Sequence, residues 1–63
     1  MRIHKGMNID CKEGVQKGLS YKVISNPYFI RGLKVINAKN IVSGVNVVFT
    51  LKELANHKLY DIF

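Results

Sequence analysis

The clearest pattern of apolar and polar residues in this chain begins at Val45. Every second residue from Val45 to Leu51 is apolar, which is typical of a strand with one buried face. The period then changes to that of a helix, with apolar residues at Leu54, Ala55, Leu59 and Ile62. Thr50 is a favourable N-cap, and Glu53 three residues later completes a capping box. We therefore expect a strand that continues directly into a C-terminal amphipathic helix.

The N-terminal half also alternates. Met7, Ile9 and Cys11 are separated by polar residues, and apolar residues return at Val15, Leu19, Tyr21 and Val23. This pattern predicts a hairpin with a three-residue loop, Lys12 to Gly14, in which Gly14 is left-handed and Gly18 occupies a bulge. The alternative is a short helix capped by Asp10, but it would hold two glycines, each costing about 1 kcal/mol relative to alanine.

A turn at Ser25-Asn26-Pro27-Tyr28 is predicted in the middle of the chain, because proline fixes φ and the Ser and Asn side chains bond locally to the backbone. Phe29 to Ile36 is then expected to form a strand bent at Gly32. Asn37 to Asn40 is predicted to be a four-residue hairpin loop that leads into Ile41 and Val42.

These elements predict an α+β, mostly β fold in one domain, residues 1–63. We expect a small, bent antiparallel sheet of four or five strands, SH3-like or a meander, with one C-terminal helix across an open end. A domain of this size buries only about 60% of the surface of its unfolded chain, so we expect marginal stability. Met1 to Gly6 have no clear pattern.

Composition and charge restrict the environment and the partners. The chain has a single cysteine, Cys11, and no segment resembling a signal peptide or membrane span, so we expect a soluble, cytoplasmic protein. The net charge of +6 favours an anionic partner. However, Lys, Asn and Ile make up 21 of the 63 residues, which is typical of an AT-rich genome and weakens the argument from charge.

The sequence contains few residues suited to catalysis or metal binding. Cys11, His57 and Asp61 could form a catalytic triad only if the fold brought them together, and no sequence pattern predicts this. One cysteine and two histidines do not provide the paired ligands of a zinc site, and no glycine pattern matches a phosphate-binding loop. We therefore expect no catalysis, no metal, no cofactor and no small-molecule substrate.

The segment from Tyr21 to Val35 suggests a binding surface, because aromatic residues alternate there with cations around a proline. Aromatic rings can stack on bases while cations contact phosphates. We expect Tyr21 and Phe29 to belong to the core and Tyr28 to be exposed. The leading hypothesis is a non-enzymatic nucleic-acid-binding module whose candidate site consists of Lys22, Tyr28, Arg31, Lys34 and Lys39.

The same segment resembles the KOW motif of SH3-like small barrels, found in bacterial transcription elongation factors and some ribosomal proteins. The resemblance includes Val23 to Pro27, Gly32 and Val35, and Gly44 to Leu54 is similar to the closing strand and final turn of that barrel. Asn26 stands where that motif usually has glycine, which asparagine can replace in left-handed geometry. The resemblance covers Leu19 to Leu54 and implies RNA, DNA or protein contacts through loops near Asn26 to Arg31.

The alternative hypothesis is a protein-binding adaptor or inhibitor of the type that phages and mobile elements encode. Lys58 interrupts the apolar face of the expected helix, and an apolar tail follows it. Such a tail at a chain end is expected to dock on the domain itself, on a second copy or on a partner. The residues assigned to this contact are Leu59, Tyr60, Ile62 and Phe63.

Overall fold

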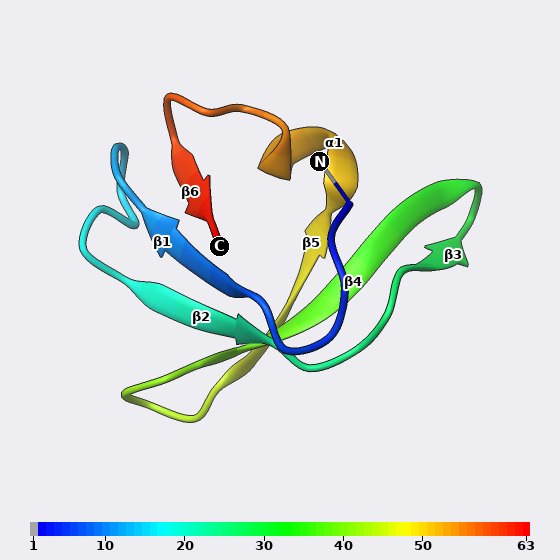
Figure 1. Cartoon of the computed structure of the whole chain (residues 1–63), viewed down its shortest axis with the longest axis horizontal. Helices are drawn as coiled ribbons and strands as arrows, with labels where there is room; N and C mark the ends of the chain where they lie inside the picture. The colour runs from blue at the N-terminus through cyan, green and yellow to red at the C-terminus, as the bar shows by residue number, and fades with distance from the viewer. Residues whose placement is uncertain (1) are drawn as a thin grey trace.

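The computed structural model describes residues 2–63 and shows a curled antiparallel sheet of six strands with one short helix (Figure 1). The strand order is β3-β4-β2-β1-β6, and β5 pairs with the other edge of β4. The predicted mostly β fold is confirmed, although the sheet has more strands than expected. The elements are β1 (Asn8–Cys11), β2 (Ser20–Val23), β3 (Tyr28–Ile30), β4 (Leu33–Asn40), β5 (Asn46–Thr50), α1 (Leu51–Leu54) and β6 (Tyr60–Ile62).

The long strand β4 organises this sheet. One of its edges pairs with β3 at Leu33 to Val35 and with β2 at Ala38 to Asn40, while its other edge pairs with β5 over Val35 to Lys39. The segment Asn37 to Asn40, predicted to be a hairpin loop, is therefore a central strand segment, and that prediction is wrong. Its polar composition misled the prediction, because Ala38 is fully buried and packs in the core.

The predicted turn around Pro27 interrupts a strand without reversing the chain. Val23 pairs with Ala38 and Tyr28 pairs with Val35, so β2 and β3 follow the same edge of β4 in one direction. The intervening residues are held by side chains. Ser25 Oγ accepts a hydrogen bond from the Asn37 N–H at 2.9 Å, and the Tyr28 hydroxyl donates to Asn37 Oδ1 at 2.6 Å. The sequence correctly predicts that the strand stops here.

A two-residue turn, Arg31-Gly32, joins β3 to β4, so the predicted continuous strand from Phe29 to Ile36 is wrong. Both turn residues have positive φ, 49° for Arg31 and 79° for Gly32. A type I′ hairpin turn requires this geometry, and glycine adopts it without steric cost, whereas arginine does not. Phe29 and Lys34, and Ile30 and Leu33, become direct cross-strand neighbours.

Replacing Arg31 by asparagine is expected to stabilise the domain by about 0.5–1 kcal/mol, because asparagine tolerates the left-handed conformation that costs other residues about 1–2 kcal/mol. Urea unfolding measures the change. The matched control is Arg31→Ala, which removes the same charge but keeps the unfavourable backbone preference. Equal stability of the Asn and Ala variants would show that the backbone strain at Arg31 is negligible.

The hairpin between β4 and β5 has its loop at Ile41 to Val45, which leaves Ile41 and Val42 exposed and outside any strand. Asn40 starts the turn, because its Oδ1 accepts hydrogen bonds from the N–H groups of Val42 and Ser43 at 2.9 and 3.0 Å. The prediction that the hairpin loop ends at Asn40 and leads into Ile41 and Val42 is therefore wrong, because these two residues lie in the loop itself. β5 has the predicted alternation over Val47 to Phe49, with Phe49 buried and Val48 exposed, but Val45, predicted to begin this strand, lies in the loop and is exposed.

The connection from β1 to β2 is an eight-residue loop, residues 12–19, instead of the predicted three-residue loop. Gly14 is left-handed as predicted, but Val15 is fully exposed. Gly18 has the predicted bulge geometry. The Gly18 N–H donates to the Cys11 carbonyl and the Cys11 N–H donates to the Leu19 carbonyl, both at 2.9 Å, so two residues oppose one. Its φ of 88° is that of a glycine in a G1 bulge.

The C-terminal segment differs most from the sequence prediction. Thr50 caps α1 as expected, accepting a hydrogen bond from the Glu53 N–H at 3.1 Å, but the helix ends at Leu54. Asn56 then holds a different turn: its side chain accepts from the Lys58 N–H and its carbonyl from the Leu59 and Tyr60 N–H groups. The chain continues as β6, which pairs with β1. The predicted long C-terminal helix is therefore wrong.

The core lies inside the curl of the sheet. The N-terminal segment contributes Ile3 to it, α1 contributes Leu54, and β6 contributes Ile62. The Tyr21 ring, predicted to be core, is buried edge-on against Phe49 with ring centroids 5.2 Å apart. The buried cluster consists of Ile3, Ile9, Cys11, Tyr21, Val23, Ile36, Ala38, Phe49, Leu54 and Ile62.

Candidate functional site

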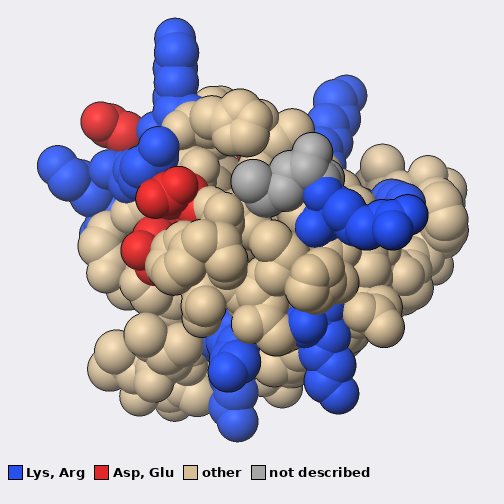
Figure 2. Space-filling model, in the orientation of Figure 1, with Lys and Arg blue, Asp and Glu red and all other residues tan. Residues whose placement is uncertain are grey.

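Acidic residues are confined to one part of the molecule. The four acids are Asp10 in β1, Glu13 in the loop after it, Glu53 in α1 and Asp61 in β6, and residues 14–52 contain none. On the face shown in Figure 2, acidic side chains lie on the side of β1 and β6 together with basic ones, whereas the side of β3 shows basic side chains without acidic ones. On this face, no acidic side chain therefore offsets the positive charge beside the β3–β4 hairpin.

Two of the predicted nucleic-acid-binding residues are direct neighbours. Lys22 in β2 lies opposite Lys39 in β4, and Asn8 and Asn46 extend this row across β1 and β5. Both lysines are exposed on the outer face of the sheet. Like charges placed directly opposite each other on a sheet are destabilising, so this pair lowers the stability of the fold.

Lys34 lies on the other face of β4. It is five residues from Lys39, and successive side chains of a strand point to opposite faces. Arg31 is at the tip of the β3–β4 hairpin, and Tyr28 is half-buried with its hydroxyl bonded to Asn37. The predicted exposure of Tyr28 is therefore only partial. The five predicted residues do not form one surface.

A basic groove lies beside Lys34. It has a volume of about 490 Å³ and is bounded by the N-terminal segment, the β2–β3 connection, β4 and the start of α1. Its cationic side chains are Arg2 and Lys34, and His4 also lines it. The lining residues, which we call the basic groove, are Arg2, Ile3, His4, Pro27, Lys34 and Leu51.

Phe29 projects from the same face as Lys34, its direct cross-strand partner. Its side chain is 69% exposed, so the prediction that Phe29 belongs to the core is wrong. The reason is its position near the hairpin tip, beyond the part of β4 that covers the core. An exposed phenylalanine beside a basic groove provides a stacking surface next to cations.

Arg2 and His4 are functional candidates that the sequence reasoning missed. The buried Ile3 anchors this segment in the core, and its two neighbours are exposed. Gly6 also attaches this segment to β2, because its N–H donates a hydrogen bond to the Val23 carbonyl at 2.9 Å. The isolated apolar Ile3 between two basic residues is the sequence signal that could have identified this segment.

The residues predicted to bind a partner lie in and around β6. Ile62 is buried, Leu59 and Tyr60 are half-buried, and Phe63 is 60% exposed. The backbone of Phe63 exchanges two hydrogen bonds with Asn8, at 2.7 and 3.0 Å. The expected apolar tail therefore docks on the domain itself, and Phe63 is the member of this set whose side chain is mainly exposed.

Cys11 is the only thiol considered for catalysis. Burial, and to a lesser extent the Asp10 carboxylate, raises the pKa of the Cys11 thiol, which disfavours the reactive thiolate. The thiol lies 3.9 Å from the Gln16 side-chain oxygen. Within residues 2–63, no group of three or more His, Cys, Asp or Glu side chains is positioned to hold a metal ion.

Comparison with protein-family models, with curated proteins and with solved structures finds no match to this chain. Among the described residues, no helix has the length and apolar character needed to cross a membrane.

Proposed function

We propose that the chain is an SH3-like small barrel. Two features support this assignment: a strongly curled antiparallel sheet and a short helical turn, α1, that precedes the closing strand β6. The last strand, β6, pairs with the first strand, β1, so the curled sheet runs from β5 through β4, β2 and β1 to β6. The KOW-like segment from Leu19 to Leu54 then includes β2 to α1.

We further propose that the protein is a non-enzymatic nucleic-acid-binding module, and that it binds single strands through the basic groove and Phe29. The observation that carries this proposal is the placement of an exposed aromatic ring, Phe29, opposite Lys34, which lines a groove that also contains Arg2 and His4. Aromatic rings beside a basic groove bind unpaired bases by stacking and the backbone by charge. Duplexes offer no such free base faces.

The outer-face pair Lys22 and Lys39 lies apart from this groove. It adds to the positive field of the domain but has no exposed aromatic partner in its row, which contains Asn8 and Asn46. We therefore assign it to long-range attraction and assign the contact itself to the groove. The two lysine positions, Lys34 and Lys39, become a matched pair for mutation.

A salt titration tests the function. Binding of fluorescently labelled single-stranded RNA and DNA oligonucleotides is measured by anisotropy between about 50 and 200 mM salt. With two phosphates contacted, by Arg2 and Lys34, the logarithm of the association constant is expected to fall with a slope of about −1.4 against the logarithm of salt concentration. Duplexes of the same sequence are expected to bind more weakly. An affinity that does not change with salt, or no binding at low salt, would refute the proposal.

A further inference from the structure

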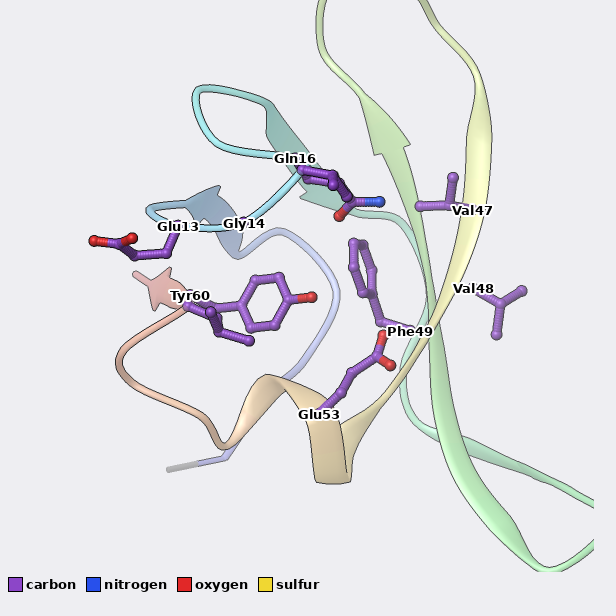
Figure 3. A pocket seen from close by; sticks show the side chains of 10 residues that line it. Glu13, Gly14, Gln16, Val47, Val48, Phe49, Glu53 and Tyr60 are labelled. Carbon is purple, nitrogen blue, oxygen red and sulfur yellow. The ribbon is translucent and has the colours of Figure 1, made fainter.

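A second hollow lies on the acidic side of the domain, between the β1–β2 loop, β5, α1 and the start of β6 (Figure 3). Its volume is about 370 Å³. It shares no lining residue with the basic groove. We call it the acidic pocket and define it by Glu13, Gln16, Val47, Phe49, Glu53 and Tyr60.

The walls of the acidic pocket are aromatic and aliphatic. The Phe49 and Tyr60 rings meet edge to face with centroids 5.8 Å apart. Figure 3 shows the phenol end of Tyr60 pointing into the hollow, Val47 pointing toward it and Val48 pointing away. An extended side chain that enters here would contact the Tyr60 ring and the small exposed part of Phe49, and aromatic faces attract cations.

The charge of the pocket is opposite to that of the whole protein. Two of the four acidic residues in a chain of net charge +6 line it, but Figure 3 shows the Glu13 carboxylate pointing away from the hollow, so the charge inside comes from Glu53. The Glu53 carboxylate points into the hollow and the Gln16 amide reaches it from the loop (Figure 3). Burial, followed by the Glu53 carboxylate, raises the pKa of the Tyr60 hydroxyl, so this hydroxyl stays protonated. The pocket therefore presents acceptor oxygens at the end of an aromatic wall.

β5 provides a further binding element beside the pocket. It pairs with β4 along one edge, and among the described residues its second edge pairs with no strand. The backbone groups on such an edge can bind an extended chain in the manner of an added strand. A strand placed there would run past Val47 and Phe49, at the mouth of the acidic pocket.

We propose that the acidic pocket binds a lysine or arginine side chain of a partner protein, whose extended segment lies along the free edge of β5. The aliphatic stem of that side chain packs against Phe49 and Tyr60, and its charged end meets Glu53 and the Gln16 oxygen. This site repels phosphates, so the proposal does not depend on nucleic-acid binding. It assigns a second binding partner to the domain.

Short designed peptides test this proposal on the full chain. The probes are acetylated, amidated five-residue peptides with valine at flanking positions and lysine, arginine, norleucine or glutamate at the centre. Two-dimensional NMR spectra of the backbone amides follow titrations to about 1 mM and above. The lysine and arginine peptides are expected to shift the amides of Gln16, Val47 to Phe49 and Tyr60. The norleucine peptide, which lacks the charge, is expected to bind about two- to fivefold more weakly.

Glu53→Gln provides the decisive variant, because glutamine keeps the side-chain size and the helix cap but removes the charge. It is expected to weaken the binding of the lysine peptide about two- to fivefold and to leave the binding of the norleucine peptide unchanged. Asp61→Asn is the matched control, since it removes an exposed acid of β6 outside the lining. Equal binding of lysine and norleucine peptides, shifts at other amides, or no shifts would overturn the proposal. The same shifts on concentrating the protein alone would also overturn it, by showing that a second copy fills the pocket.

Discussion

Ile62→Ala is expected to destabilise the domain by about 2–4 kcal/mol, because it empties a buried position between β6 and the core. A domain of this length has a total free energy of unfolding of about 3–9 kcal/mol, so this single change removes a large part of it. Deleting residues 60–63 is expected to unfold the domain, since it also leaves the edge of β1 at Ile9 and Cys11 without its partner strand. Urea denaturation followed by circular dichroism measures both effects.

Phe63→Ala separates a role in the core from a role in binding. The Phe63 side chain is mainly exposed, and its backbone hydrogen bonds to Asn8 survive the substitution. Its effect on stability is expected to stay within about 0.5 kcal/mol. If Ile62→Ala proved as mild as Phe63→Ala, β6 would not be an integral part of the folded sheet.

Lys34→Glu is expected to reduce single-stranded RNA or DNA binding by about tenfold or more and to make the salt dependence shallower by about one phosphate contact. Reversing a charge inside the basic groove removes one phosphate contact and adds repulsion. Lys39→Glu makes the same change on the opposite face of β4, where it also relieves the repulsion from Lys22. It is expected to weaken binding only slightly and to raise stability by about 0.2–1 kcal/mol.

Phe29→Ala separates stacking from charge in nucleic-acid binding, because the loss of a stacked base and the loss of a phosphate contact change the salt dependence of the affinity differently. Loss of one stacked base is expected to cost about 1–3 kcal/mol of binding free energy while leaving the salt slope unchanged. The exposed Phe29 side chain makes a small contribution to the core, so the fold should persist. Equal losses for Lys34→Glu and Lys39→Glu, together with no effect of Phe29→Ala, would indicate non-specific attraction by the whole basic surface.

Local signals in the sequence predicted the elements whose geometry is set by near neighbours. The Thr50 cap, the strand alternation around Ile9, Tyr21 and Phe49, and the bulge at Gly18 each depend on a few adjacent residues. The β3–β4 turn was missed because Arg31 occupies a conformation that arginine disfavours. Gly32 alone suggested a bend and did not indicate a hairpin.

Elements that depend on distant partners were not predictable in the same way. The apolar spacing from Leu54 to Ile62 fits a helix, but Asn56 provides a turn and β1 provides an edge with which β6 pairs. Asn37 resembles a loop residue in sequence, although its neighbours Ile36 and Ala38 are fully buried. Its backbone N–H donates a hydrogen bond to Ser25, and its side-chain oxygen accepts one from Tyr28. The basic groove combines residues near position 3 with residues near position 34, so no local pattern could place it.

The pairing of Ile9 with Ile62 also has a kinetic consequence. The turns of the β3–β4 and β4–β5 hairpins are short, so these hairpins require little loop closure, whereas joining β6 to β1 closes almost the entire chain and costs more entropy. A domain whose final pairing connects its two ends has a high contact order, and such domains fold slowly for their size. We therefore expect the three-stranded unit of β3, β4 and β5 to form before β6 adds to β1, with the interior of the sheet open to solvent until that last step.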